Sequence, residues 1–268
     1  MAPLLRLAGI GKRYGAVEAL TGVDLEIAAG EVVAICGDNG AGKSTLIRIV
    51  SGAHEPSQGT IELDGRAVVF SSPIDALKSG IATIYQDLAL APRLPIWQNV
   101  FVGAELTRRL APGVRVLDKR AMREASSGYL TRLKVEVRDT DRPVERLSGG
   151  QRQAVAIARA LHWNARLVIM DEPTAALGVA ESREVLSLIR ELHRNGTTVI
   201  LVSHNMAEVV DVATRVVVFK GGRKIADRPA EGLTADDLAH LVMVGHIIGH
   251  IIGPVIGHAV DNTARAAR

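Results

Sequence analysis

The segment GDNGAGKST, residues 37–45, constrains the fold of this chain more than any other stretch. It matches the pattern G-x-x-x-x-G-K-[ST], follows the apolar run EVVAIC, and precedes a segment that predicts a helix from Lys43 to Gly52. Gly37, Gly40 and Gly42 allow backbone N–H groups to close around phosphate oxygens, and the helix start adds its partial positive charge. A strand, a phosphate-binding loop and a helix in this order predict an α/β core.

The side chains of this loop predict nucleotide binding. Lys43 would reach the β- and γ-phosphates, and the Ser44 hydroxyl would bind Mg²⁺. A glycine-rich structural turn is the alternative interpretation, which the strand-loop-helix context disfavours. The candidate nucleotide-binding residues here are Gly37, Asp38, Asn39, Gly40, Ala41, Gly42, Lys43, Ser44 and Thr45.

Two acidic residues end the apolar run RLVIMDE. Four apolar residues place Asp171 at the carboxyl end of a buried strand, beside the glycine-rich loop, where it can hold Mg²⁺ directly or through water. Glu172 comes next and can act as the general base that polarises the attacking water. An apolar run followed by Asp-Glu is common in proteins, so this pair is a strong signal only together with the phosphate-binding loop.

A second phosphate-binding feature is LSGGQ, which ends at Gln151 and precedes the Ala-rich segment RQAVAIARAL. That segment predicts a buried helix. Ser148, Gly149 and Gly150 would form its first turn, with free N–H groups and a hydroxyl facing outward. One chain therefore carries two motifs of a kind that binds phosphate.

The order of the predicted elements indicates an α/β fold with two additions. Short β-rich runs separated by glycine-containing turns predict an N-terminal antiparallel β-subdomain. From about residue 87 to 161 helical signals dominate, which predicts an inserted α-helical subdomain. RLVIMD and TTVILVS are typical of buried parallel strands, and the amphipathic segment between them, closed by Gly196, predicts a helix. The expected architecture is a RecA-like P-loop NTPase core over residues 1–230, followed by a tail over residues 231–268.

Composition narrows the functional classes. The net charge is +3 and no block of like charges stands out, so we expect an ordinary solvated surface and no nucleic-acid partner. The single cysteine, Cys36, excludes a disulfide within the chain, fits a reducing compartment, and is expected simply to pack in its strand. We find neither a signal peptide nor an apolar run of ~18 residues, and we expect a soluble or peripheral cytosolic protein.

Residues 245–260 contain a four-residue repeat, GHII, GHII, GPVI, GHAV. His246 and His250 have the i, i+4 spacing of metal ligands, and the glycines resemble small-residue packing motifs. Because Gly and Pro254 disfavour a helix there, we expect a poorly ordered or edge-packed tail instead.

Over roughly residues 4–226 the chain resembles the nucleotide-binding subunit of ATP-binding cassette (ABC) transporters, with the family's motifs in order. The resemblance implies that ATP and Mg²⁺ are the cofactors and that two such domains pair head to tail. Ser148 to Gln151 of one domain would then complete the ATP site that the Lys43 loop of the other forms. This arrangement explains why one chain carries two phosphate-binding motifs.

Three further residues match the family's pattern. Gln86, at the end of the predicted strand IATIYQ, matches the glutamine that senses Mg²⁺ and signals toward the membrane partner. His204, at the end of TVILVSH, matches the histidine that contacts the γ-phosphate. Both follow predicted core strands, where sites of α/β proteins gather. Tyr14 matches the aromatic residue that stacks on adenine, with simple packing as the alternative.

The stretches YQDLAL, DEPTAALG and SHNM resemble the carbohydrate-importing branch that handles ribose, xylose and fructose. Members of that branch often fuse two cassettes, but this chain has one phosphate loop and one LSGGQ. The resemblance then implies a homodimer on separate membrane permease subunits, at the cytoplasmic face of the inner membrane, supplied by a periplasmic sugar-binding protein. Gly178 stands where most cassettes have an Asp at the dimer seam. We expect it to alter communication between the two ATP sites without breaking either.

Three other functions stay open. A small-molecule kinase or GTPase would use Lys43 and Asp171 but gives LSGGQ, Gln86 and His204 no role. A non-transport ABC ATPase, in DNA repair or cluster assembly, is the second; repair types usually carry coiled-coil or zinc insertions, which this sequence lacks. The third is a regulatory nucleotide-binding clamp without hydrolysis, against which Glu172 argues.

Overall fold

The strand before the glycine-rich loop, β3 (Val32–Gly37), is buried along its whole length in the computed structural model, which describes residues 3–244. Val33 and Ile35 belong to one hydrophobic cluster, whereas Ala34 and Cys36 belong to another. A strand that is apolar on both sides needs a covering layer on each face, which is the usual situation in a parallel sheet. The prediction that Cys36 packs in its strand is confirmed.

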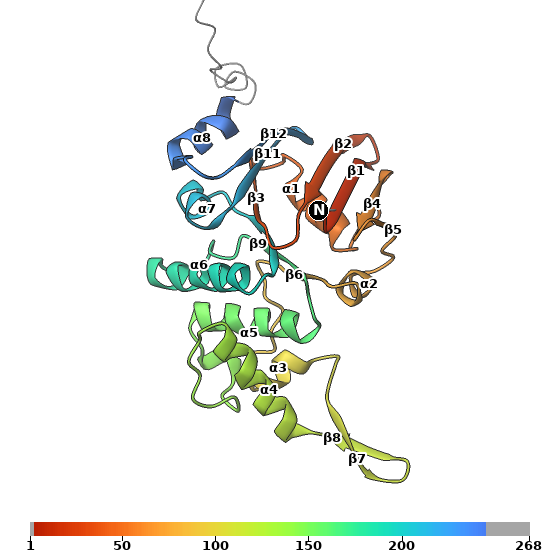
Figure 1. The fold of residues 1–268 in the computed structure, drawn as a ribbon, viewed down its shortest axis with the longest axis vertical. Coiled ribbons are helices and arrows are strands. Elements are labelled where there is room, and N and C mark those ends of the chain that lie inside the picture. The colour runs from red at the N-terminus through yellow and green to blue at the C-terminus, as the bar shows by residue number, and fades with distance from the viewer. Residues whose placement is uncertain (1–2, 245–268) are drawn as a thin grey trace, which may run out of the picture.

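β3 lies inside a largely parallel sheet (Figure 1). All neighbouring strands in this sheet are parallel except the edge strand β12, which runs antiparallel to β11. The carboxyl ends of β3, β9 and β10 therefore meet at one edge, where the predicted site residues follow. In spatial order the strands are β12 (Arg223–Pro229), β11 (Arg215–Lys220), β3, β10 (Thr198–Val202), β9 (Leu167–Asp171) and β6 (Ile81–Ile84).

One face of this sheet is covered by α1 (Lys43–Val50) and an antiparallel sheet, as predicted (Figure 1). Apolar side chains of α1, such as Ile47, share a cluster with Leu7 of the small sheet and Ile35 of the core sheet. The helix that begins at the phosphate-binding loop is thereby fixed from two sides. The small sheet has the order β2 (Val17–Ile27), β1 (Leu5–Tyr14), β4 (Gln58–Leu63) and β5 (Arg66–Val68); α2 (Pro73–Lys78) leads into β6.

The other face carries α6 (Val179–Arg194), α7 (Met206–Val212) and α8 (Ala235–Val244). Leu238 and Leu241 of α8 are buried in a cluster with Val216 of β11. Residues 235–244, which we placed in the tail, therefore pack against the core as a helix. The repeat with His246 and His250 lies outside the described residues.

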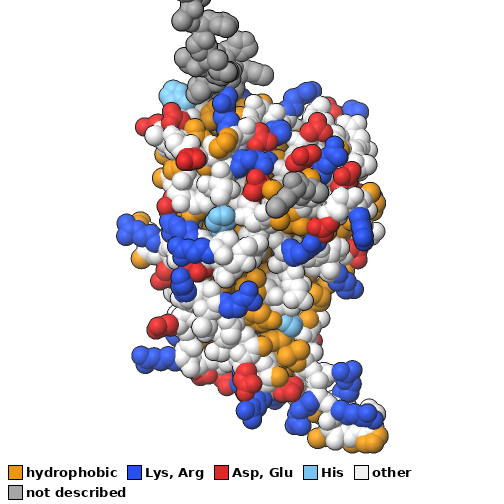
Figure 2. Space-filling model, viewed as in Figure 1, with side chains coloured by type: hydrophobic (Ala, Val, Ile, Leu, Met, Phe, Trp, Pro, Cys, Tyr) orange, Lys and Arg blue, Asp and Glu red, His pale blue; other side chains and the backbone are white. Residues whose placement is uncertain are grey.

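The region 87–161 holds α3 (Ile96–Phe101), α4 (Lys119–Arg132), a short 3₁₀ turn (Val144–Arg146) and α5 (Gly149–His162). It also contains a β-hairpin that we did not predict, formed by β7 (Thr107–Ala111) and β8 (Val114–Leu117). The hairpin projects from the end of the molecule opposite α8 (Figure 1), and arginine and apolar side chains cover its surface (Figure 2). Across residues 3–244, every helix is too short or too polar to cross a membrane.

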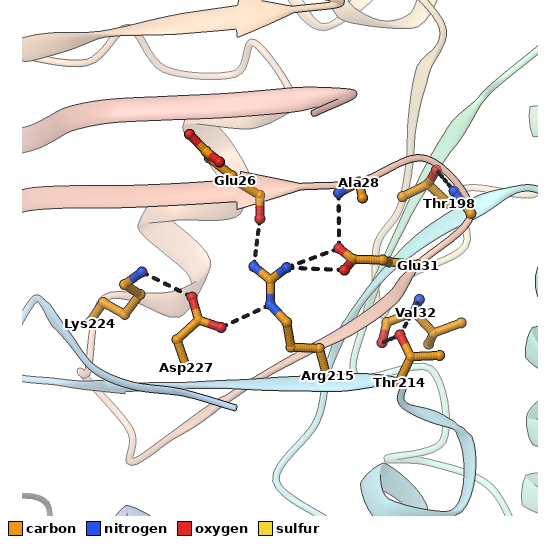
Figure 3. Close-up of polar contacts among 10 residues, drawn as sticks. Glu26, Ala28, Glu31, Val32, Thr198, Thr214, Arg215, Lys224 and Asp227 are labelled. Atoms are coloured by element: carbon orange, nitrogen blue, oxygen red, sulfur yellow. Dashed lines mark hydrogen bonds and ion pairs between the residues drawn. The ribbon is translucent and has the colours of Figure 1, made fainter. Parts of the chain in front are cut away.

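Arg215 ties the small sheet to the core sheet (Figure 3). Its guanidinium donates to the Glu31 carboxylate at 3.0 Å, to the Glu26 carbonyl oxygen at 2.5 Å, and to Asp227 Oδ1 at 2.8 Å. Glu31 in turn accepts from the Ala28 N–H at 2.9 Å. These contacts fix the connection from β2 to β3. They thereby fix the start of β3, the strand that leads to the phosphate-binding loop.

Candidate nucleotide-binding and catalytic site

The glycine-rich loop has a backbone that only glycine allows at its key positions. Gly37 and Gly42 have φ values of 149° and 102°. A Cβ atom on Gly37 would lie 2.2 Å from the Phe219 carbonyl oxygen, and one on Gly42 would lie 2.7 Å from Leu20 Cδ2. Gly42 also precedes the first residue of α1, so the loop ends at a helix N-terminus that attracts anions.

Lys43 lies inside this loop. Its side chain is buried, and Nζ donates to the carbonyl oxygens of Gly37 at 2.6 Å and Asp38 at 3.0 Å. The ammonium group is thereby held above the loop backbone without a described carboxylate partner among residues 3–244. Ser44, one residue further on, is exposed. This arrangement offers a cation and a hydroxyl to a phosphate group.

β9 ends at Asp171 and Glu172 follows it, as predicted. Burial raises the pKa of Asp171 above its ordinary value, and the neighbouring Glu172 charge raises it further, while Lys43 and Arg48 oppose the shift. Glu172 has a left-handed backbone with φ of 50°, and its N–H donates to the Val202 carbonyl oxygen at 2.9 Å. A non-glycine residue held in this conformation is typical of functional sites.

His204 comes from a different strand but meets Glu172. Its Nδ1 lies 2.8 Å from Glu172 Oε2. The two side chains line one pocket together with Thr174, whose hydroxyl donates to Glu208 at 2.5 Å. The structure therefore brings Glu172, the predicted base, together with His204, which is predicted to contact the γ-phosphate.

Gln86 does not end a strand, contrary to our prediction. β6 ends at Ile84, and Gln86 is an exposed residue in the bend that follows. The strand stops there because β6 pairs with β9 only as far as Met170. Gln86 nevertheless lines a cavity of about 370 Å³ with Glu172 and Gly149. The cavity thus joins residues from the loop after β6, the end of β9 and the start of α5.

Tyr14 is exposed at the end of β1, with 41% of its surface accessible. The His54 ring meets it edge-on at 5.7 Å between centroids, and Lys12 Nζ lies 5.3 Å from its ring centroid. The ring is held by these neighbours at the surface, where it does not serve as core packing.

The LSGGQ segment caps α5, and this corrects one expectation. Ser148 Oγ accepts from the Gln151 N–H at 3.1 Å, while Gln151 Oε1 accepts from the Ser148 N–H at 3.2 Å. The Gly149 N–H, which we expected to be free, donates to Glu181 Oε1 at 2.7 Å. The Gly149 N–H is not free because the Glu181 carboxylate, on α6, reaches the start of α5.

The two phosphate-binding motifs of one subunit belong to different parts of the fold. α1, which follows the Lys43 loop, packs against β2 and β3, whereas α5 packs against α3, α4 and α6. Glu181 was missed by the sequence analysis, although a Glu three residues after Gly178 is a helix-start signal. Gln153 was also missed; it is buried, and its Nε2 donates to the Pro173 carbonyl oxygen at 2.9 Å, beside Glu172.

Residues 20–175 match a family model described as ABC transporter. The chain belongs to this family. As a member, this cassette binds ATP and hydrolyses it to power transport. The matched residues include the Lys43 loop, the LSGGQ turn and the Asp171-Glu172 pair, so the motifs and the fold lead to the same family.

Curated relatives are similar along most of the chain. The xylose/arabinose import ATP-binding protein XylG of Sulfolobus acidocaldarius is 46% identical over 90% of this chain and 94% of its own length. The fructose import ATP-binding protein FrcA of Rhizobium meliloti is 46% identical over 83% of this chain and 87% of its own. The ribose import ATP-binding protein RbsA 1 of Streptomyces coelicolor is 44% identical over 91% of this chain, which spans only 47% of that protein.

Solved structures share the fold. The cassette cbiO1 from Clostridium perfringens, part of the ABC transporter complex cbiONQ, has a TM-score of 0.75 and 29% identity, covering 94% of this chain and 99% of its own. A dimeric, post-hydrolysis form of the ATP-binding cassette MJ0796, bound to ADP and Pi, has a TM-score of 0.69 and 28% identity, covering 85% of this chain and 100% of its own.

Proposed function

We propose that this cassette hydrolyses ATP for a monosaccharide importer. It works as a homodimer on separate membrane permease subunits, at the cytoplasmic face of the inner membrane, with a periplasmic sugar-binding protein delivering the substrate. The observation that carries the sugar assignment is 46% identity to both a xylose/arabinose and a fructose import protein over most of their lengths. The catalytic domain spans residues 1–230, with the helical part at about 87–161 inserted.

The Lys43 loop holds the phosphates of ATP. Backbone N–H groups of residues 37–45 surround them, and the Lys43 ammonium neutralises charge at the β- and γ-phosphates. Tyr14 offers a ring face to adenine, and its neighbours Lys12 and His54 fix the ring.

Mg²⁺ fits the residues of this site. Asp171 and Glu172 are adjacent carboxylates at a buried strand end, and the pKa of Asp171 is raised by its burial and then by the neighbouring Glu172 charge. Asp171, the Ser44 hydroxyl and the Gln86 amide oxygen are the oxygen ligands that Mg²⁺ prefers, and these residues would hold it. When bound, the ion neutralises charge on the β- and γ-phosphate oxygens.

Glu172 acts as the general base. Its carboxylate accepts a proton from the attacking water. The contact between Glu172 Oε2 and His204 Nδ1, at 2.8 Å, orients that carboxylate. His204, exposed at the pocket, then presents its other ring nitrogen toward the γ-phosphate. The buried Gln153 supports this geometry because it holds the carbonyl oxygen of Pro173.

The second half of each ATP site comes from the partner subunit. Ser148, Gly149, Gly150 and Gln151 form the start of α5, whose N–H groups and hydroxyl suit a γ-phosphate. Within one subunit α5 packs on α3, α4 and α6, whereas α1, which follows the Lys43 loop, packs on β2 and β3. Head-to-tail pairing is therefore the arrangement that gives both phosphate-binding motifs a ligand.

Two measurements test the proposed function. ATPase activity per subunit should rise with protein concentration until the dimer is saturated, because the sites are made by two subunits. Co-purification with permease subunits, followed by stimulation of the ATPase by xylose, ribose or fructose with the binding protein, tests the transport role. A rate independent of concentration, or a complex that no sugar stimulates, would count against the proposal.

A further inference from the structure

Two carboxylates of α6 lie against the first turn of α5. Glu181 Oε1 accepts from the Gly149 N–H at 2.7 Å, and Glu181 Oε2 lies 3.4 Å from the Gly178 N–H. Glu184, one turn further along α6, lies beside Gly150 and has its Oε2 3.5 Å from Ser148 Oγ. The turn that is to meet a phosphate from the partner subunit is therefore in contact with anions of its own subunit.

The fit between these groups is close. A Cβ atom on Gly149 would lie 2.4 Å from Leu177 and 3.0 Å from Glu181 Oε1. A Cβ atom on Gly150 would lie 2.1 Å from Glu184 Oε2. Side chains of α6 and of the segment before it thus fill the space over the glycine pair, and both glycines are buried.

Glu181 is charged at neutral pH. The N–H of Gly149, and then that of Gly178, hold the pKa of the Glu181 carboxyl below its ordinary value. A charge-assisted hydrogen bond of this kind is stronger than one between neutral groups. A γ-phosphate that approached the same N–H would meet a like charge that already uses the donor.

We propose that Glu181 is a further functional residue of the ATPase, which competes with the partner's nucleotide for the Gly149 N–H. In the free subunit the Glu181 carboxylate holds the start of α5 on α6. On ATP-dependent pairing the γ-phosphate takes over the donor, and α5 and Glu181 separate. This inference rests on the proposed head-to-tail ATP site, because it assigns a competitor to one half of that site.

The consequence is a threshold for dimer formation. Each subunit must give up an internal hydrogen bond to a charged group before its α5 turn accepts the phosphate, and Glu184 adds like-charge repulsion to that exchange. Removing the charge of Glu181 should therefore favour the ATP-bound dimer. If the Glu181 contact served only to stabilise the fold, its removal would leave dimerisation unchanged or weaken it.

The test measures ATP-dependent dimerisation by analytical ultracentrifugation, with Glu172→Gln as the background that holds ATP unhydrolysed. In this background Glu181→Gln keeps the length of the side chain but removes its charge. We expect the dimer dissociation constant at saturating ATP to fall about tenfold, because at each of the two sites a charge-assisted hydrogen bond becomes a weaker neutral one, which is worth about threefold per site. The gain should shrink at high salt, which screens partly exposed charges. Glu181→Ala, which removes the acceptor as well, should show at least the same gain.

Two controls separate the possible failures. Glu136→Gln removes the same charge from an exposed site that makes no hydrogen bond or ion pair with other residues between 3 and 244, and should leave the dissociation constant unchanged. Ser148→Arg should abolish ATP-dependent dimerisation. If Ser148→Arg dimerises normally, the shared ATP site is wrong and the role of Glu181 is overturned with it. If Ser148→Arg fails to dimerise but neither Glu181 variant gains, only the inference about Glu181 is overturned.

Discussion

Nδ1 of His204 lies 2.8 Å from Oε2 of Glu172, although the two residues follow different strands. The adjacent strands β9 and β10 run parallel, so their ends lie side by side. The left-handed backbone of Glu172 turns its side chain away from the path that a continued strand would give it. The contact places Glu172, the proposed base, and the His204 ring at the same end of the sheet.

Replacing Glu172 by Gln should lower kcat by roughly 10²–10⁴-fold, because the amide cannot accept a proton from water. ATP affinity should be retained, since the Lys43 loop is untouched. The Glu136→Gln variant provides the charge-matched control and should keep its full rate. Steady-state turnover together with nucleotide titration checks this, and a Glu172→Gln variant with normal kcat would remove Glu172 from the mechanism.

The raised pKa of Asp171 predicts a pH-dependent gain for Asp171→Asn. Because the folded pKa lies above the unfolded value, the ionised carboxylate lowers stability at neutral pH, and this penalty disappears as pH falls toward the unfolded value of about 3.9. Asp171→Asn should therefore raise Tm at pH 7 by roughly a few degrees, with less gain near pH 4.

The same variant tests the metal assignment. With ATP present, Mg²⁺ should raise the Tm of the unaltered protein more than that of Asp171→Asn, because the Asn amide offers the ion a neutral oxygen in place of a carboxylate. Thermal melts at both pH values with and without Mg²⁺ give all of these numbers. An equal Tm gain of Asp171→Asn at pH 7 and pH 4 would contradict the raised pKa of Asp171. An equal Tm response of both proteins to Mg²⁺ would contradict the metal assignment.

Gly178 lies at the start of α6, with φ −71° and ψ 166°, and an added Cβ would meet no atom of residues 3–244 within 4 Å. Asp therefore fits there. Its carboxylate would cap α6 by accepting from the N–H of Ala180 or Glu181, for a gain of a few tenths of a kcal/mol, and would add a second negative charge beside Glu181. We expect Gly178→Asp to change the Hill coefficient for ATP more than the maximal rate. Gly178→Ala should leave both the Hill coefficient and the maximal rate unchanged. A Gly178→Asp variant whose maximal rate collapses at constant cooperativity would refute this account.

Arg215→Ala should destabilise the fold by about 1–3 kcal/mol, because Glu31 and Asp227 would lose their shared partner in a partly buried network. Arg120→Ala breaks an exposed pair with Glu124 on α4 and should have a much smaller effect on stability, because solvent screens that pair. Chemical denaturation of both variants measures the difference. Equal effects would mean that the Arg215 network does not hold the two sheets together.

Local patterns were enough to predict the strand-loop-helix at Lys43 and the end of β9 at Asp171, whereas β10 ends at Val202, two residues before His204. Each depends on residues that are close in sequence, such as glycines with positive φ or an apolar run before two acids. The hairpin β7–β8 was not predicted although Pro112-Gly113 marks its turn, because its strands are short and exposed and do not bury an apolar face.

Contacts between distant segments could not be read from the sequence. Gly149 and Glu181 are separated by 32 residues, and Gln153 and Pro173 by 20. Only the packing of α5 on α6 brings each pair together. For the same reason the N–H of Gly149 was expected to be free, although the sequence did predict that this turn begins a helix.

A mixed dimer tests the central claim, that each ATP site uses Lys43 of one subunit and Ser148 of the other. One differently tagged subunit carries Lys43→Ala and its partner carries Ser148→Arg, and the mixed species is purified by both tags. Head-to-tail pairing leaves one site with an unaltered Lys43 loop and an unaltered Ser148 turn. The account predicts about half of the normal rate for the mixed dimer, while either variant alone is inactive, because none of its sites combines an unaltered Lys43 with an unaltered Ser148. Two working sites, or none, in the mixed dimer would contradict it.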